Sequence, residues 1–553
     1  MKMKGMLLAS LTLLSGAVML TACSANQRKA SDSKTLYLMQ TGDILSLDNS
    51  NQANLTQWNV LEQSMEGMYR AGKNGKLIPA MATSIVKPTN SGRTYTYHLR
   101  KNARWSNGDP VTAQDFVTSW RRSTAPTSKS GYNYIFTGIK NAEQISAGKM
   151  PPSSLGVRAL DRHTLRVDLE YAMPYFNKMM VMPAFFPQNT GYVKKFGDKY
   201  GTNSARVACN GAFKVQGWTG TNDKWSLTPN THYYDRKNIR MDKMVMQIVK
   251  DSNTAHQLFQ ENKLDDAQIT GTTAQGLQKN KNLMHLTRGG VYYLRMNLAE
   301  NRAFSNKNLR HAVYLALDRN ELAKKVLSDG STASGTYVAR KLATDPTTER
   351  DFATEMTPSE TFNMKKAKEL WNKGMEELGK SSVTLDLVTD DQTVSKNVGQ
   401  FVQSKVETAF KGAKVNVESV PSKSSSGKVS NGDFDMNLTL WLADFANPVS
   451  DFDVLSSSNP QNYGKYNSPA YDSQLAQARK NGNDEKAFWQ NMRNAQQLLN
   501  DDMPAVPLYT MTESHLVNPK LSGVLYHSVG ETDYTRAYHH RSEERFSRNA
   551  ETD

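Results

Sequence analysis

The chain has 553 residues, of which 38% are hydrophobic and 22% are charged, so its composition is that of a folded protein rather than a disordered one. Its 68 Lys and Arg residues outnumber its 53 Asp and Glu residues, which gives a formal net charge of +15. The positive residues are spread along the sequence, and neither an arginine-rich block nor a zinc-finger spacing occurs. Composition therefore favours an exported protein near anionic lipid and wall polymers over a nucleic-acid-binding protein.

The N-terminal segment has the layout of an export signal. Two lysines near the start are followed by an apolar stretch over residues 6–20 and then by Leu-Thr-Ala-Cys23. This ending resembles the lipobox of bacterial lipoproteins. The resemblance implies that residues 1–22 form a signal peptide and that Cys23 carries a lipid anchor, such as palmitate, on the outer face of the membrane of a Gram-positive bacterium. A plain signal peptide with an incidental cysteine is the alternative. Residues 23–34 are small and polar, which predicts a flexible tether.

The first predicted element is a short strand over residues 35–39. Apolar and polar residues then alternate over residues 94–100, which is the period of a half-buried strand. The Ser-Asn-Gly-Asp-Pro run at 106–110 predicts a turn because Gly and Pro fix its backbone. Thr112 is placed to cap the helix that follows, with Asp115 three residues later in its first turn.

The second half of the chain predicts alternating helices and strands. A helix is expected over residues 306–327, where apolar residues recur on one face. Residues 383–389, 394–410 and 415–420 read as strand, helix and strand, which is typical of a parallel crossover. The serine- and lysine-rich residues 422–428 predict a solvated loop. The alternating residues after it predict a strand that ends close to Asp444.

Several motifs in chain order resemble the oligopeptide-binding lipoproteins of ABC importers, the large family 5 type of extracytoplasmic solute-binding proteins. The most specific is Trp105-Ser-Asn-Gly-Asp-Pro-Val-Thr-Ala-Gln-Asp-Phe116. It is accompanied by Glu66-Gly-Met-Tyr69, Asn210-Gly-Ala-Phe-Lys-Val215 and Trp441-Leu-Ala-Asp-Phe-Ala-Asn-Pro448. The resemblance extends over residues 36–538. Ala212 stands where the family usually has Pro, and Phe445 stands where it commonly has Tyr, which puts any hydrogen bond of that hydroxyl in doubt.

This resemblance implies an α/β fold of the periplasmic-binding-protein type, with two hinged lobes, the ligand between them, and an extra subdomain. Lobe I would comprise residues 35–60, 201–290 and 510–540, the extra subdomain residues 61–200, and lobe II residues 291–509. It also implies a monomeric, membrane-anchored component that captures oligopeptides mainly through their backbone and delivers them to the permease subunits of an ABC transporter.

The same resemblance implies a set of ligand-binding residues. Asp444 would pair with the free α-amino group of the peptide. The backbones of Leu440 and Leu442 would bind the peptide backbone, Trp441 would border a side-chain pocket, Tyr293 would stand on the facing strand, and Leu55 would contact the ligand backbone from lobe I. Backbone recognition of this kind gives affinity that does not depend on the side chains. The alternative for Asp444 is a turn-forming role beside Pro448.

Signatures of enzymes and of metal sites are missing. The sequence contains no His-Glu-x-x-His, Gly-x-Ser-x-Gly or Cys-x-x-Cys motif. Gly271-Thr-Thr-Ala-Gln-Gly276 begins like a phosphate-binding loop but lacks the Lys and Ser or Thr that must follow. We therefore expect no enzymatic activity, no cofactor and no metal, and we expect Cys209 to be a buried small hydrophobic residue.

Other ligands and another class of protein stay open on this evidence. The same fold could bind a pheromone peptide, a metal chelate or a sugar oligomer, and a surface lipoprotein with an adhesin role is the second class. Residues 541–553 read like the translation of a sequencing adapter, so we predict a disordered tail of artefactual origin. A genuine C-terminal tail is the alternative.

Overall fold

The computed structural model describes residues 34–51, 55–128 and 132–540. The predictions for residues 1–22, for Cys23, for most of the tether and for residues 541–553 lie outside the described residues. Within the described ranges, no helix combines the length and the apolar character that crossing a membrane requires.

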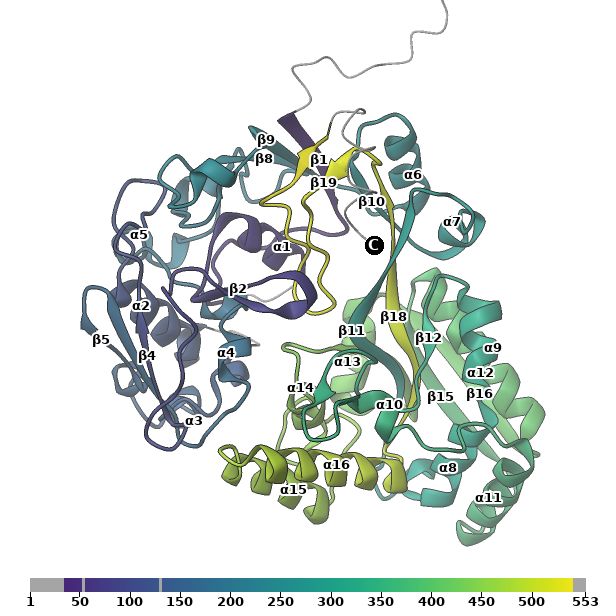
Figure 1. Ribbon diagram of the computed structural model, residues 1–553. Helices are drawn as coiled ribbons and strands as arrows, with labels where there is room; N and C mark the ends of the chain where they lie inside the picture. The colour runs from purple at the N-terminus through teal and green to yellow at the C-terminus, as the bar shows by residue number, and fades with distance from the viewer. Residues whose placement is uncertain (1–33, 52–54, 129–131, 541–553) are drawn as a thin grey trace, which may run out of the picture.

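One sheet of eleven strands runs through the whole molecule (Figure 1). Its centre is an antiparallel pair of long strands, β11 (Leu283–Met296) and β18 (Ala505–Val517). On one side of this pair the order continues through β17 (Met436–Leu442), β15 (Val383–Asp390) and β16 (Ala413–Val420). On the other side it continues through β10 (Asp266–Ile269), β1 (Thr35–Gln40), β9 (Lys243–Ile248), β8 (Lys224–Pro229) and β7 (Phe213–Gln216), with β12 (Thr332–Ala333) paired to β18.

The two ends of the sheet form two lobes, as predicted. Lobe II is the lower right part of Figure 1, where helices α8 (Lys307–Ala316), α11 (Met364–Glu377) and α12 (Thr393–Ala409) cover β15 and β16. Strands β15 and β16 pair in parallel from Val383 with Ala413 onward, so the predicted crossover is confirmed. Lobe I is the upper part, where α6 (Ser252–Gln260) and α7 (Gly271–Gly276) lie beside β10.

Two predictions for lobe II were wrong. The predicted helix over 306–327 breaks after α8, because Asp318 accepts hydrogen bonds from the backbone N–H groups of Asn320 and Glu321 and so caps a new helical turn. The Arg319 guanidinium donates to the Leu317 carbonyl oxygen at 2.8 Å, which satisfies the end of α8. The predicted loop at 422–428 is instead helix α13 (Ser422–Asn431), because buried Val429 packs in a cluster with Val388 and Phe434.

The extra subdomain, at the left of Figure 1, is built on a three-stranded antiparallel sheet of β4 (Thr94–His98), β6 (Thr164–Asp168) and β5 (Val157–Asp161). Helix α2 (Ala113–Thr124) packs on this sheet through buried Phe116 and Trp120. The predicted cap is confirmed, because the backbone N–H of Thr112 donates to an Asp115 carboxylate oxygen at 2.9 Å. The same oxygen accepts from the Trp105 indole at 3.1 Å, so hydrogen bonds connect the two ends of the Trp105–Phe116 motif.

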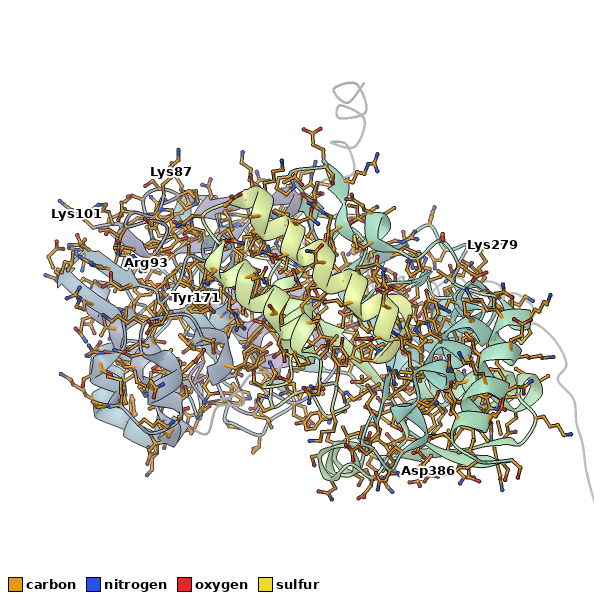
Figure 2. All side chains as sticks on the ribbon, turned by 90° about the horizontal axis from the view of Figure 1, so that it is seen from below. Lys87, Arg93, Lys101, Tyr171, Lys279 and Asp386 are labelled. Atoms are coloured by element: carbon orange, nitrogen blue, oxygen red, sulfur yellow. The ribbon has the colours of Figure 1, made fainter. Side chains whose placement is uncertain are left out.

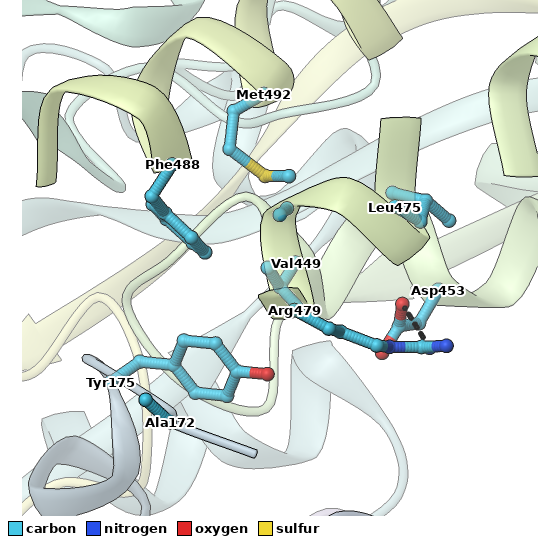
Figure 3. Close-up of a pocket in the computed structure, with 9 residues that line it drawn as sticks. Ala172, Tyr175, Val449, Asp453, Leu475, Arg479, Phe488 and Met492 are labelled. Carbon is cyan, nitrogen blue, oxygen red and sulfur yellow. Dashed lines mark hydrogen bonds and ion pairs between the residues drawn. The ribbon is translucent and has the colours of Figure 1, made fainter. Parts of the chain in front are cut away.

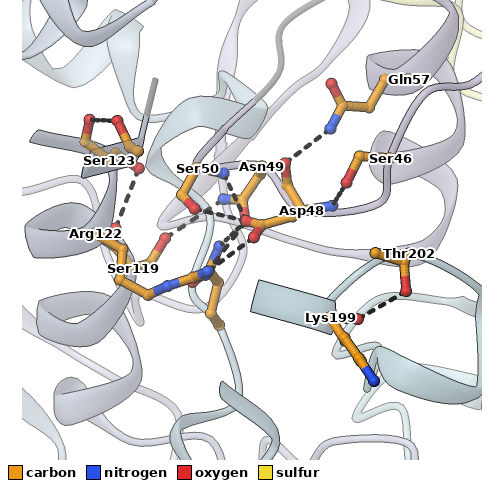
Figure 4. A network of polar contacts seen from close by, with 12 residues as sticks. Ser46, Asp48, Asn49, Ser50, Gln57, Ser119, Arg122, Ser123, Lys199 and Thr202 are labelled. Carbon is orange, nitrogen blue, oxygen red and sulfur yellow. Dashed lines mark hydrogen bonds and ion pairs between the residues drawn. The ribbon is translucent and has the colours of Figure 1, made fainter. Parts of the chain in front are cut away.

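A buried carboxylate joins lobe I to the extra subdomain (Figure 4). Asp48, 1% exposed, lies in the loop before helix α1 (Leu55–Ser64) and pairs with the Arg122 guanidinium at 2.9 Å. The same carboxylate accepts hydrogen bonds from Ser50 at 2.6 Å and from the side-chain amide of Gln188 at 2.8 Å. Since Arg122 belongs to α2, this network fixes the orientation of α2 relative to lobe I.

A second buried charged cluster lies where the pairing of β11 with β18 is interrupted. The register runs from Leu283 to Thr287 and resumes only at Val291, so the ladder breaks at residues 288–290. At the break, the guanidinium of Arg288 is bidentate to Glu513, with both distances 2.9 Å, and lies 3.9 Å from Glu531. Burial raises the pKa of Glu531 to about 7. The positive charge of Arg288 lowers this pKa, but the negative charge of Glu513 raises it further.

His515 extends this cluster into lobe I. Its ring contacts Asp266 at 2.7 Å and Glu513 at 3.4 Å. Burial disfavours the charged ring, but the charges of Asp266 and Glu513 outweigh it and raise the pKa of His515 to about 10. Conversely, although burial favours neutral Glu513, Arg288 and His515 hold the pKa of Glu513 at about 2. The cluster is therefore charged at neutral pH.

We predict that Asp48→Ala lowers the free energy of unfolding by about 3 kcal/mol, because it leaves Arg122 without its buried partner. Urea unfolding followed by tryptophan fluorescence measures the change. Asp43→Ala is the matched control, since its ion pair with Lys250 at 3.0 Å is exposed and is worth about 0–1 kcal/mol. Equal effects of the two substitutions would show that the Asp48 network does not bind the extra subdomain to lobe I.

We also predict a pH-dependent contribution from His515. Its pKa is raised above its ordinary value, so its contribution to stability is complete below about pH 6.5 and is lost as the pH rises towards about 10. His515→Gln should therefore be less stable than the wild type at pH 6, and the difference should shrink by pH 10. His98→Gln, on the exposed end of β4, is the control. A difference that stays constant from pH 6 to pH 10 would contradict a charged His515.

Candidate ligand-binding site

The end of β17 positions the predicted site residues of lobe II. The backbone N–H of Ala443 donates to the Gly289 carbonyl oxygen at 2.9 Å, which keeps the chain against β11 beyond the end of the strand. Ser450, in helix α14 (Val449–Phe452), then fixes two of those residues. Its hydroxyl accepts from the Asp444 backbone N–H at 2.7 Å, and its carbonyl oxygen accepts from the Trp441 indole at 2.9 Å.

The Asp444 carboxylate is buried between lobe II and the extra subdomain, and its residue is 8% exposed. The hydroxyl of Tyr134 donates to one oxygen at 3.0 Å, and the hydroxyl of Tyr132 donates to the other. Burial raises the pKa of Asp444 to about 6, and the two tyrosine hydrogen bonds oppose this rise. Within the described part of the chain, no lysine, arginine or histidine forms an ion pair with it. Asp444 is thus an ionised, buried carboxylate at neutral pH that is bound only by neutral donors.

Leu440 and Leu442 lie on a strand edge that is only partly paired. Strand β15 pairs with β17 at Met436 and Asn437 and with no later residue of β17. Because Ala443 directs its N–H to β11, alternate residues place those of Leu440 and Leu442 on the opposite edge. The described chain provides no strand partner there, so this edge can accept an extended backbone.

Tyr293 and Trp441 share one face of the sheet. Tyr293 lies on β11 opposite Thr439, and Trp441 lies on the same face of β17 because side chains alternate along a strand. Tyr293 is 4% exposed and packs edge-on against Tyr337 at 6.2 Å, so it lies mainly in the core. Leu55 is the first residue of α1, but its side chain lies outside the described residues.

Sequence reasoning missed the two tyrosines that bond to Asp444 and the tryptophan that packs on one of them. Tyr132 and Tyr134 come from an irregular segment of the extra subdomain with no periodic pattern, and they lie more than 300 residues before Asp444. Trp58, on α1, contacts Tyr132 edge-on with the ring centroids 5.1 Å apart. The two tyrosines are two residues apart in the sequence, but this spacing does not indicate a partner in lobe II.

The extra subdomain also contacts lobe II next to Asp444. Phe445 stacks on Tyr175 with the ring centroids 4.9 Å apart and an interplanar angle of 9°. This stacking contact is made by the phenyl ring itself, without the hydroxyl of the Tyr that is common at this position. Lys178 donates to the Ala446 carbonyl oxygen at 2.9 Å, and burial lowers the pKa of Lys178. These contacts hold residues 444–446 against the subdomain.

A small cavity continues this interface (Figure 3). Ala172 and Tyr175 line it from the extra subdomain, and Phe488 and Met492 of helix α16 (Glu485–Asp502) line it from lobe II. Viewed from below, α16 and its neighbour α15 (Pro469–Lys480) cross the middle of the molecule with Tyr171 beside them (Figure 2). The cavity is lined mainly by apolar atoms and does not reach Asp444, so it is part of the interface rather than of the site.

Among the described residues, no three His, Cys, Asp or Glu side chains gather closely enough to hold a metal ion. Cys209 is 2% exposed, so the prediction of a buried residue is confirmed, and burial raises the pKa of its thiol to about 11. Buried carboxylate–histidine pairs occur at His515, in the cluster between β11 and β18, and at His539, which lies 3.0 Å from Asp265.

Comparison with known proteins identifies the family. Residues 76–463 match the bacterial extracellular solute-binding proteins, family 5. A dipeptide-binding protein of Lactococcus lactis is 30% identical over 538 residues, which are 95% of this chain and 96% of the relative. Among solved structures, Listeria monocytogenes OppA bound to peptide has a TM-score of 0.81 and 31% identity and covers 92% of this chain and 99% of its own. The pheromone receptor PrgZ has a TM-score of 0.81 and 32% identity, with 92% and 100% covered. The chain therefore belongs to family 5 of the bacterial extracellular solute-binding proteins, the oligopeptide-binding group of ABC importers, whose members bind solutes and are not enzymes.

Proposed function

We propose that this protein captures oligopeptides between its two lobes and delivers them to the permease of an ABC importer while a lipid on Cys23 anchors it to the membrane. The observation that carries the proposal is the Asp444 carboxylate, which is buried and lacks a cationic partner in the described chain. The α-ammonium group of a peptide supplies such a partner. The relatives named above support the choice, since their descriptions name dipeptide, peptide and pheromone binding.

The rest of the peptide lies along the free edge of β17 in this proposal. Leu440 and Leu442 direct backbone groups to that edge, and a strand added there would bond to them whatever its side chains. Trp441 borders the pocket of a peptide side chain, and Tyr293 supports Trp441 from the neighbouring strand. Leu55 contacts the ligand backbone from lobe I. The protein works as a monomer, since the site is complete within one chain.

The ammonium of a peptide would bind Asp444 alongside the two tyrosine hydroxyls and more strongly than either of them. A neutral hydrogen bond contributes about 0.5–1.5 kcal/mol, whereas hydrogen bonds to charged groups contribute about 1.5–3 kcal/mol. Each carboxylate oxygen has two lone pairs, so an ammonium can bind Asp444 while Tyr132 and Tyr134 keep their contacts. Both hydroxyls then hold the carboxylate in the orientation that the ligand requires.

Asp444→Asn tests the anchor. We expect this variant to bind tetra-alanine at least about 100-fold more weakly than the wild type, because it leaves the ammonium of the ligand buried without a charge partner. Isothermal titration calorimetry measures the affinity, and N-acetyl-tetra-alanine, which lacks the ammonium, should bind both proteins equally. Asp386→Asn, at the far end of lobe II in Figure 2, is the matched control. Equal losses for the free and the acetylated peptide would disprove the amine anchor.

The affinity should also depend on pH. Asp444 must be ionised to bind the ammonium, and its pKa in the free protein is raised to about 6. The dissociation constant of the free-amine peptide should therefore be constant above about pH 7 and rise about tenfold for each pH unit below about 6. Titrations from pH 4.5 to pH 8 check this slope. The same slope in Asp444→Asn would assign the pH dependence to another group, such as the cluster around Arg288.

A further inference from the structure

The side chain of Trp58 has a buried, unpartnered N–H group close to Asp444 and has no part in the function proposed above. It lies on α1 in lobe I, is 7% exposed, and its indole N–H is buried without a hydrogen-bond partner in the described chain. Its ring packs edge-on against Tyr132, with an interplanar angle of 76°. Tyr132 in turn donates its hydroxyl to Asp444. Trp58 is therefore one ring away from the carboxylate that anchors the ligand.

A buried N–H group without an acceptor is unfavourable, because it has lost its hydrogen bond to water and gained none. Two other tryptophans in the described ranges, Trp225 on β8 and Trp371 on α11, share this feature. They differ in position: Trp225 lies on a strand of lobe I away from Asp444, and Trp371 stacks on Phe410 inside lobe II at 4.3 Å. The position of Trp58 beside the anchor, and not the unpartnered group alone, distinguishes it.

We propose that Trp58 is a further ligand-binding residue, whose indole N–H donates a hydrogen bond to a backbone carbonyl oxygen of the bound peptide near its amino end. The inference rests on the proposed function. A peptide extends by about 3.3–3.6 Å per residue, so the first two carbonyl oxygens of a peptide anchored at Asp444 stay within about 7 Å of its amino end. This reach is comparable with the 5.1 Å between the ring centroids of Trp58 and Tyr132, whose hydroxyl bonds to Asp444. Every peptide carries these oxygens, so the contact adds affinity without selecting a side chain.

Trp58 and Asp444 come from opposite sides of the site. Trp58 belongs to lobe I, whereas Asp444 belongs to lobe II, and Tyr132 of the extra subdomain contacts both. A ligand that bonds to Trp58 and to Asp444 at once links the two lobes directly. Such a ligand stabilises the closed arrangement by the contacts that it makes only there.

Trp58→Phe removes the donor and keeps an aromatic ring against Tyr132. We expect its dissociation constant for tetra-alanine to rise about tenfold, which corresponds to about 1.4 kcal/mol. Trp225→Phe removes an equally unpartnered indole elsewhere in lobe I and should leave the affinity within about twofold. An unchanged affinity of Trp58→Phe, or an equal loss in Trp225→Phe, would overturn the inference.

Changing the ligand separates hydrogen bonding from packing. Two tetra-alanine analogues, in which an (E)-alkene replaces the first or the second peptide bond, each lack one carbonyl oxygen. One of the two analogues should bind the wild type about tenfold more weakly than tetra-alanine. In Trp58→Phe, the same analogue should bind less than about threefold more weakly than tetra-alanine. The same discrimination in both proteins would show that Trp58 does not bond to either carbonyl.

A measurement on the wild-type protein covers the case in which the variant does not fold. The indole N–H signals of ¹⁵N-labelled protein report the eight tryptophans of the chain separately. The Trp58 signal should move downfield on addition of tetra-alanine, because its N–H then donates a hydrogen bond. A signal that does not move would mean that no acceptor reaches Trp58. Failure of the wild type to bind the peptide would overturn the proposed function together with this inference, whereas tight binding with an unmoved Trp58 signal would overturn this inference alone.

Discussion

The ladder between β11 and β18 is the constraint on which the arrangement of the lobes depends, because both of these long strands of the described chain extend from lobe I into lobe II. Its register shifts between residues 287 and 291 and again between residues 292 and 293, and Arg288 lies in the first of these interruptions. There the backbone of Gly289 bonds to other segments instead of β18: its N–H donates to the Ser528 carbonyl oxygen at 2.7 Å, and its carbonyl oxygen accepts from the Ala443 N–H at 2.9 Å. Arg288 bonds to Glu513 on β18 and to the Gly530 carbonyl oxygen on the C-terminal segment. Rotation of one lobe relative to the other would have to preserve or rebuild these bonds.

The charge balance of this cluster differs from that of the ligand site. In this cluster the carboxylates of Glu513, Glu531 and Asp266 outnumber the two cations, Arg288 and His515, and burial raises the pKa of Glu531. At Asp444 no cation of the described chain compensates the carboxylate at all, and two neutral phenols replace it. The first cluster is thus largely satisfied within the protein, whereas the second gains strongly from a cation that arrives from outside. This difference explains why one buried carboxylate is structural and the other suits a ligand.

Much of the fold followed from local patterns, and the failures have physical reasons. The Thr112 cap and the crossover from β15 to β16 were predictable because hydrogen bonds and apolar periodicity are local to each element. The helix α13 was not, because it is stabilised by packing of Val429 against Phe434 and against Val388 of β15, about 40 residues earlier in the chain. The motif singled out Asp444 as a candidate, whereas no sequence pattern pointed to Tyr132 or Trp58. Their role depends on a contact between three segments that the sequence separates by tens to hundreds of residues.

Contacts between the extra subdomain and lobe II limit what a ligand has to do. The Phe445–Tyr175 stack and the hydrogen bond from Lys178 to Ala446 form between protein groups alone, so part of the closing free energy is supplied without a ligand. A ligand shifts the equilibrium only by the contacts that it makes in the closed form and not in the open one. An ammonium at Asp444 satisfies this condition, since the carboxylate is buried by groups from another part of the molecule. In the function proposed above, a buried charge at the meeting point of the lobes would therefore couple the recognition of the amino end of a peptide to closure.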